Sequence, residues 1–426
     1  MIKDIYPSKT KFNRSLNFQK LGKLISKNQE NVYLNGLYGS SITFFLIDLF
    51  SNVKKPIFFI TDKKEESSYI YTDIVEHLGE NYCSMLPSSF NKFSTKTVNK
   101  DQVLSRTKIL EKIYLNEPRV YISNCEGIIE KIPAKNGNTN YEILLNENDQ
   151  FSLYELNEKL FALEYTKEDF VQSPGDFALR GNILDVFSYS NENPIRIQFD
   201  DDKIERIREF NIDTQYSNND IKKIKISPNI NSEFLEKNDS VINIINNDYI
   251  IVINSLDLIN EELKKLNPSN DLNYYNYKKF NEEVKNKITL FLNNRTEKLF
   301  YDFKIKPQPS FNKNFNLLND SLTDFFKKGY KLNLFFSTFE QSERFKQILD
   351  KYEREYEYKS IIKPIYRGFI NENEKKLYLS DHEIFNRFHK FKLSKRFSKS
   401  KRIKISELKN LEPGDYVTHI DHGVGI

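Results

Sequence analysis

The chain contains no tryptophan and only two cysteines and two methionines among its 426 residues. The cysteines, Cys83 and Cys125, are too few for a disulfide framework or a cysteine-rich metal site, and they fit a reducing compartment. No apolar run approaches the length of a membrane span, and the N-terminal residues do not resemble a signal peptide. We therefore expect a cytoplasmic protein that binds no metal and has no membrane partner.

An excess of charge of one sign is also missing. The 64 basic and 60 acidic side chains leave a formal net charge of +4, which argues against a strongly polybasic nucleic-acid-binding protein. Aromatic residues are abundant instead: 34 phenylalanines and 25 tyrosines can build sizeable cores. The length predicts about three domains.

Residues 1–135 alternate strand and helix patterns, which favours a parallel sheet with crossover helices. Strands are predicted at 32–34, 56–61, 82–86 and 119–123, and helices at 40–50, 65–78 and 101–115. Residues 136–210 then change to one helix, 153–163, followed by short strands. This change indicates a small α+β domain inserted into the first α/β domain.

Residues 211–305 return to the earlier character, and we expect them to complete the first domain. Strands are predicted at 222–227 and 249–253, and helices at 256–266 and 278–298. Pro307-Gln308-Pro309 ends the pattern. Residues 315–392 predict a second small α/β domain, with helices at 317–328 and 340–352 and strands at 332–337 and 376–379.

A basic segment follows this small domain. Between residues 390 and 404, eight of fifteen residues are Lys or Arg. We interpret residues 393–410 as a solvated linker, with a nucleic-acid contact as the alternative.

The stretch between the first strand and the first helix has the position of a phosphate-binding loop. It reads Gly36-Leu37-Tyr38-Gly39-Ser40-Ser41-Ile42-Thr43. Compared with G-x-x-x-x-G-K-[ST], Ser41 replaces the second glycine and Ile42 replaces the lysine, and only Thr43 remains, as a potential hydroxyl on the magnesium side. Ile42 cannot offset phosphate charge, and Ser41 adds a side chain where the loop needs a permissive backbone. We therefore expect that this degenerate loop does not bind or hydrolyse ATP.

Two arginines occur in strand patterns of the inserted domain. In residues 194–199 apolar residues alternate with Arg196 and Gln198, and in residues 176–180 Arg180 shares a face with Ala178. Two arginines on the solvent side of one small sheet can bind an acidic partner surface. The alternative is that both are ordinary solvated side chains. The same alternation places Asp200 on the arginine face.

Residues 173–217 resemble the small inserted domain shared by the excinuclease protein UvrB and the bacterial transcription-repair coupling factors. The resembling residues are Gly175, Arg180, Gly181, Leu184, Asp185, Pro194, Arg196, Phe199, Ile207, Arg208, Phe210, Asp213 and Gln215. The resemblance implies binding to the excinuclease protein UvrA through Arg180 and Arg196. Where the family often has two adjacent aromatics, this chain has Phe199 and Asp200, which implies a weaker interface.

The C-terminal residues carry a second resemblance. Pro-Gly-Asp predicts a turn and residues 416–420 alternate like a strand. Tyr416, His419, His422 and Gly423 are similar to the opening of the CarD-like, Tudor-type domain with which coupling factors bind the RNA polymerase β subunit. His419-x-x-His422 lacks further ligands nearby, so no metal site is predicted.

Together these motifs resemble the N-terminal part of a bacterial transcription-repair coupling factor. The degenerate loop favours that family over UvrB, whose phosphate loop is intact. The resemblance implies a monomeric adaptor that recruits UvrA to stalled RNA polymerase, within a longer ATP-dependent translocase on double-stranded DNA. ATP and Mg²⁺ would serve motor domains located beyond residue 426, and no cofactor or catalytic residue is expected in this chain. The alternatives are a divergent UvrB-like excinuclease component and a gene remnant without function.

Overall fold

The computed structural model describes most of the chain. The described residues are 21, 31–91, 98–133, 141–232, 235, 239–267, 274–294, 299–352 and 355–387, with the strands at 417–419 and 423–425. The chain divides into two units, Met1–Phe391 and Lys392–Ile426, and each is described by itself. Among the described residues, no helix has both the length and the apolar character needed to cross a membrane.

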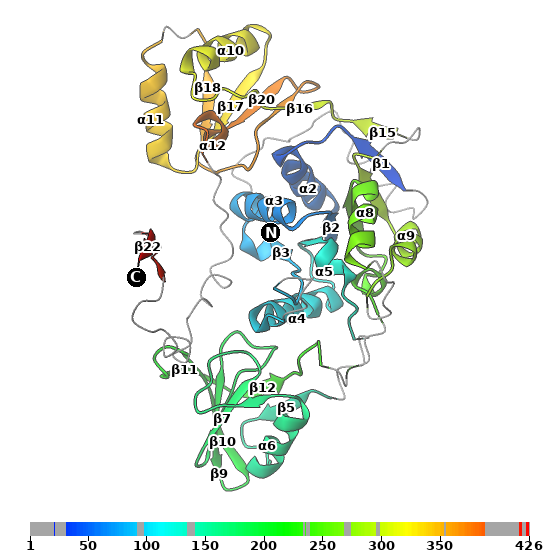
Figure 1. Ribbon diagram of the computed structural model, residues 1–426, viewed down its shortest axis with the longest axis vertical. Helices are drawn as coiled ribbons and strands as arrows, with labels where there is room; N and C mark the ends of the chain where they lie inside the picture. Colours follow the sequence, from blue (N-terminus) through cyan, green and yellow to red (C-terminus); the bar gives the residue numbers. More distant parts are fainter. Residues whose placement is uncertain are drawn as a thin grey trace. The chain divides into compact units, whose positions relative to one another are not determined.

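A seven-stranded sheet forms the largest layer of the first unit (Figure 1). Every strand pairing in it is parallel. The strand order is β15 (Leu299–Asp302), β1 (Val32–Asn35), β14 (Thr289–Leu292), β13 (Ile250–Asn254), β2 (Ile57–Thr61), β4 (Val120–Asn124) and β3 (Cys83–Met85). Segments from before and after the inserted domain thus build one sheet.

Helices cover both faces of this sheet, so its central strands are buried on both sides. One face packs on α2 (Ser40–Val53) and α3 (Lys64–Leu78), with Phe59 of β2 in that core. The other face, with Phe58, packs on α4 (Lys100–Tyr114), α5 (Cys125–Ile129), α8 (Leu256–Leu266) and α9 (Tyr277–Lys285). Two short helices, η1 (Glu80–Tyr82) and α7 (Val241–Ile244), complete the connections.

The helix predicted at 278–298 is wrong in its second half. Helix α9 ends at Lys285, and β14 follows as a fully buried strand between β1 and β13. The reason is composition: Ile288 to Leu292 is a short apolar run with β-branched and aromatic residues, and such a run fits a strand that is buried on both faces.

The inserted region contains a six-stranded sheet and a two-stranded sheet. The order of the larger sheet is β11 (Ser217–Ile221), β10 (Lys203–Phe210), β9 (Ile195–Asp200), β8 (Ile183–Val186), β7 (Asp176–Arg180) and β6 (Thr166–Lys167). Helix α6 (Leu153–Ala162) contributes Leu156 and Leu160 to the same core as Phe177 and Ile197. The smaller sheet pairs β5 (Ile143–Asn146) with β12 (Lys223–Ile226), so the boundary expected at residue 210 falls inside this arrangement.

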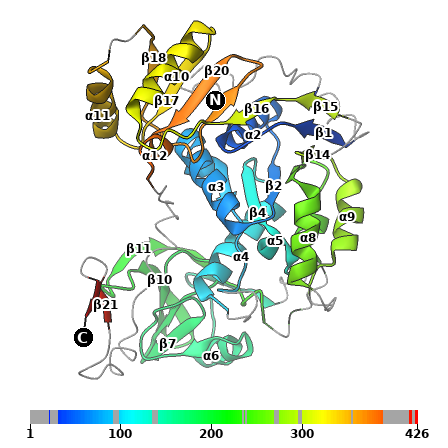
Figure 2. The same ribbon diagram turned by 45° about the horizontal axis from the view of Figure 1, so that its top comes forward.

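The small α/β domain has a five-stranded mixed sheet (Figure 2). The strand order is β16 (Ile305–Pro307), β19 (Phe369–Asn371), β20 (Lys376–Ser380), β17 (Lys331–Phe335) and β18 (Tyr358–Ile361). Helices α10 (Phe315–Lys327) and α11 (Phe339–Leu349) pack on it through Leu318, Leu322 and Phe345, and α12 (Asp381–Ile384) follows β20. The predicted mixed α/β fold class is confirmed.

In the second unit, β21 (Val417–His419) pairs antiparallel with β22 (Gly423–Gly425). Of the strand predicted at 416–420, the structure describes residues 417–419, and these form β21. Tyr416, His422 and the predicted linker at 393–410 lie outside the described residues.

Candidate functional site

The two arginines of the inserted domain lie on either side of a buried carboxylate. Strand β8 runs between β7 and β9, and its Asp185 is the direct partner of Ala178 on one side and of Arg196 on the other. Cross-strand partners point to the same face of a sheet. Asp185 is only 1% exposed, so its charge needs a partner at this position.

Both arginines supply that partner. Arg196 donates from Nε to Oδ1 of Asp185 over 2.7 Å and from Nη2 to Oδ2 over 2.9 Å, a two-pronged contact. Arg180 donates from Nη2 to the same Oδ2. The hydrogen bonds between Arg196 and Asp185 raise the pKa of the Arg196 guanidinium above its ordinary value, against the opposing effect of burial. One carboxylate thus fixes the positions of two guanidinium groups.

Aromatic rings hold the arginines from the other side. The Arg196 guanidinium carbon lies 4.7 Å from the ring centre of Phe210, and that of Arg180 lies 5.1 Å from the ring centre of Phe170. The Arg180 side chain is 39% exposed and that of Arg196 only 16%. Arg180 is therefore the more accessible of the two for a partner.

The sequence pattern places both arginines on one face, and the structure brings them together there. The pattern did not identify Asp185 as the bridge between them, although the apolar Ile183 and Phe187 share its face of the strand. An acidic residue in a run that is apolar on both faces is a signal for a buried ion pair. Asp200 lies exposed at the end of β9, beside the buried Phe199.

The degenerate loop between β1 and α2 is built around two glycines with positive φ, Gly36 at 75° and Gly39 at 55°. In a phosphate loop the first N–H groups of the following helix bind the ligand. Here the N–H of Ser40 donates to the carbonyl oxygen of Arg367 over 3.3 Å. A Cβ atom on Gly39 would lie 2.7 Å from Cβ of Arg367. A segment of the small domain therefore covers the start of α2.

A second buried carboxylate connects this loop to that segment. The hydroxyl of Ser40 donates to Oδ2 of Asp73 over 2.5 Å, and the N–H of Tyr366 lies 2.9 Å from Oδ1 of Asp73. The N–H of Arg367 donates to the Ser40 hydroxyl over 3.0 Å. Burial raises the pKa of Asp73 from 3.8 to about 7, because desolvation outweighs the hydrogen bonds that favour its charged form.

The remaining residues of the loop face the interior. Ser41, Ile42 and Thr43 are at most 2% exposed, and the hydroxyl of Ser41 donates to the carbonyl oxygen of Tyr38 over 2.8 Å. Ile42 belongs to the core that α2 shares with the sheet. Among the described residues, no group of three or more His, Cys, Asp or Glu side chains could hold a metal ion.

The inserted region matches a known family of domains. Residues 143–232 match the model of the UvrB interaction domain. This range begins at β5 and extends past β12, and it includes Arg180, Asp185 and Arg196.

The similarity to known proteins extends beyond this domain to other parts of the chain. The transcription-repair-coupling factor of Borreliella burgdorferi is 26% identical over 380 residues, which cover 75% of this chain and 33% of that protein. The transcription-repair-coupling factor of Bacillus subtilis is 26% identical over 196 residues, 46% of this chain and 17% of that protein. The transcription-repair-coupling factor of Staphylococcus haemolyticus is 24% identical over 214 residues, which cover 49% of this chain and 18% of that protein.

The matched regions thus span a third or less of the length of these relatives. The chain contains a UvrB interaction domain and is similar to the N-terminal part of transcription-repair-coupling factors, so the predicted resemblance is confirmed.

Proposed function

We propose that this chain serves transcription-coupled DNA repair as an adaptor that binds UvrA through the inserted domain. The observation that carries the proposal is the pair of arginines held by Asp185 inside the region that matches the UvrB interaction domain. Two guanidinium groups and one carboxylate leave the cluster with a net positive charge, which suits an acidic surface on UvrA.

The fixed geometry of the cluster supports specific binding. A guanidinium group carries five N–H donors. Nη1 of Arg196 also donates to the carbonyl oxygen of Gln215 over 3.2 Å, and the N–H groups of both arginines that bind neither Asp185 nor Gln215 can bind a partner carboxylate. Asp185 and the aromatic rings restrict the rotamers of both arginines before binding. Less side-chain entropy is then lost when the partner binds.

We also propose that the first domain neither binds nor hydrolyses ATP. The absence of a loop lysine and the Arg367 carbonyl at the start of α2 support this part of the proposal. ATP-driven translocation on double-stranded DNA would belong to motor domains of a longer protein. The segment from residue 411 would begin the contact with the RNA polymerase β subunit.

A binding titration with purified UvrA tests the adaptor function. Arg180→Ala and Arg196→Ala should each weaken binding at least tenfold, because truncating a hot-spot arginine costs about 2 kcal/mol or more. Arg206→Ala is the matched control: Arg206 lies on β10 of the same sheet and pairs with the exposed Asp220. Its affinity should equal that of the wild type.

The adaptor function is wrong if the folded wild-type chain does not bind UvrA. It is equally wrong if the Arg180→Ala/Arg196→Ala double variant binds as tightly as Arg206→Ala. Circular dichroism of each variant establishes that a loss of binding does not come from unfolding.

The alternative of an ATP-dependent UvrB-like protein rests on the strand, glycine turn and helix at residues 32–53. It requires nucleotide affinity at Gly36–Thr43 that Gly39→Trp abolishes. Titration with a fluorescent ATP analogue distinguishes the two functions, and we expect no saturable binding.

A further inference from the structure

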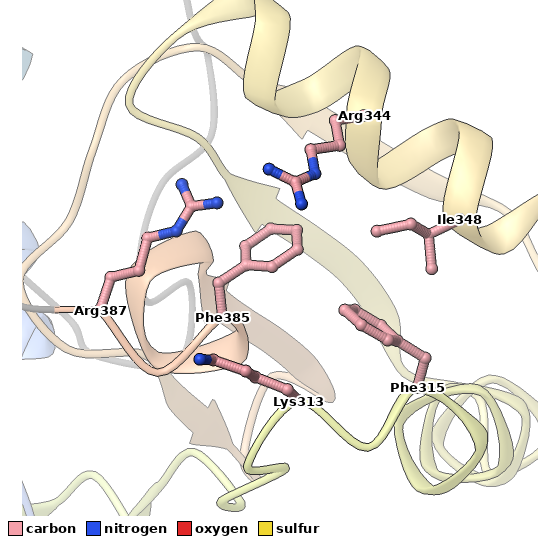
Figure 3. A pocket seen from close by; sticks show the side chains of 6 residues that line it. All are labelled: Lys313, Phe315, Arg344, Ile348, Phe385 and Arg387. Carbon is pink, nitrogen blue, oxygen red and sulfur yellow. The ribbon is translucent and has the colours of Figure 1, made fainter.

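A pocket in the small domain is lined by three cationic side chains and an apolar wall. It has a volume of about 220 Å³ and is lined by Lys313, Phe315, Arg344, Ile348, Phe385 and Arg387. Figure 3 shows the charged ends of Lys313, Arg344 and Arg387 around Phe385, with Phe315 and Ile348 on the other side. The lining residues come from the start of α10, from α11 and from the segment after α12, which lie far apart in the sequence.

The three cations have no acidic partner among the described residues. Burial raises the pKa of Asp381, and the charge of Arg387 is among the effects that oppose this rise. The two side chains do not form an ion pair with each other. The amide oxygen of Gln341, in the amide orientation that satisfies its hydrogen bonds, lies 3.2 Å from Nη1 of Arg387. The positive charge of the pocket is therefore not neutralised from within the described part of the domain.

Other lysines of the same domain do have acidic partners. Nζ of Lys327 lies 3.1 Å from Oε2 of Glu355, and Nζ of Lys376 lies 3.5 Å from Oε2 of Glu374. Lys306 and Glu372 form a third pair at 2.5 Å. Because acidic residues are frequent in this domain, their absence from the pocket distinguishes it from the surrounding surface.

The apolar wall offers aromatic rings to a flat ligand. The rings of Phe315 and Phe385 have their centres 5.7 Å apart, and the Arg387 guanidinium carbon lies 4.7 Å from the centre of Phe385. Phe385 is 5% exposed, whereas Phe315 and Ile348 are half-buried. Phe315 is thus the ring that a ligand can reach.

We propose that this pocket binds single-stranded nucleic acid, with a phosphate group at Arg344, Arg387 and Lys313 and a base against Phe315. Single strands are bound in this manner, by cations along the backbone and aromatic side chains under the bases. An acidic peptide could satisfy the cations but would not need the ring. The sequence beyond Arg387 has eight basic residues from 390 to 404 and no acidic one, which suits a polymer with one negative charge in every unit.

Fluorescence anisotropy with a labelled oligothymidylate and the full chain tests this site. Arg344→Ala should weaken binding at least fivefold and reduce the slope of log affinity against log salt by about 0.7, the value for one lost phosphate contact on a single strand. The matched control is Lys346→Ala, which removes one exposed charge from the same helix but does not line the pocket. Its affinity should stay within about twofold of the wild type.

Phe315→Leu separates a base contact from simple charge attraction. The substitution keeps an apolar side chain but removes the ring, so binding should weaken about fivefold with an unchanged salt slope, in line with the strength of base–aromatic stacking. Unchanged circular dichroism of each variant shows that the fold is retained.

Three outcomes overturn the proposal. The first is equal binding by Arg344→Ala and Lys346→Ala. The second is an affinity for duplex DNA that equals or exceeds that for the single strand. The third is tighter binding of a polyglutamate peptide, which would identify an acidic protein as the ligand. UvrA binding does not enter this experiment, so its result is independent of the proposed adaptor function.

Discussion

Asp185 of the inserted domain and Asp73 of the first domain are both 1% exposed, but they have different partners. Asp185 accepts hydrogen bonds from two arginine side chains. Asp73 accepts them from the Ser40 hydroxyl and the Tyr366 N–H, and burial raises its pKa to about 7. Asp185, with cationic partners, holds two guanidinium groups in place on one sheet, whereas Asp73, with neutral partners, connects the loop before α2 to the small domain.

The two carboxylate sites also use arginine in different ways. Arg196 acts through its guanidinium group, which Asp185 and the Phe210 ring hold in place. Arg367 acts at α2 through its backbone, since its carbonyl oxygen and N–H bind Ser40. Four substitutions test this contrast, and hydrogen exchange resolved by segment is the suitable measurement, because a chain of several domains need not unfold in one step.

The largest effect is expected for Asp185→Asn. It leaves the guanidinium of Arg196, only 16% exposed, without its counter-ion, and the inserted domain should lose about 3 kcal/mol of stability. Protection of the β7–β9 amides measures the loss. Asp220→Asn on the same sheet breaks the exposed pair with Arg206 and should leave protection unchanged. Equal effects of the two substitutions would show that Asp185 is not the structural centre of the cluster.

Gly39→Ala should have the next largest effect. It places a Cβ atom 2.7 Å from Arg367 Cβ at a residue with φ of 55°, and we expect a loss of about 1–3 kcal/mol. Gly329→Ala is the control, because Gly329 also has a positive φ, 80°, but nothing within 4 Å of the added atom. If both substitutions have the same cost, close contact with Arg367 contributes nothing.

Asp73→Asn should change the pH dependence of stability. The folded state holds the Asp73 proton up to about pH 7, whereas the unfolded state loses it near pH 3.8. Stability from this group is therefore present below about pH 4 and is lost as the pH rises through 7. Between pH 5 and pH 8, the opening free energy of the first turn of α2, from hydrogen exchange corrected for the intrinsic rate at each pH, should fall more in the wild type than in Asp73→Asn. Parallel curves for the two proteins would contradict the raised pKa of Asp73.

Arg367→Ala should have the smallest effect. The backbone contacts with Ser40 persist, whereas the cation–π contacts with Tyr366 and Tyr38 and a 3.1 Å hydrogen bond to the Tyr38 hydroxyl are lost. We expect a loss of less than about 1 kcal/mol of stability, measured as hydrogen-exchange protection of the first turn of α2. A loss as large as that of Gly39→Ala would mean that the side chain, and not the backbone, holds this segment.

Some features could be predicted because they depend on neighbours in the sequence. The alternation around Arg196 predicted the strand β9, although Arg196, expected on a solvent face, is only 16% exposed. The replacement of the loop lysine by Ile42 was evident without a fold. Helix α8 has the predicted limits, 256–266, because its apolar residues repeat with helical spacing. The helix expected at 278–298 shows the limit of this reasoning, since a short apolar run does not reveal whether it will be buried between two other strands.

The sequence alone determined the order of most helices and strands, the absence of a phosphate-loop lysine and the similarity to transcription-repair-coupling factors. Only the tertiary structure decided which side chains meet. Asp185 and Arg180 are five residues apart, but they meet because β7 and β8 pair in one register. Arg367 reaches Gly39 across more than 300 residues. Such contacts depend on strand pairing and domain packing, which local periodicity does not encode.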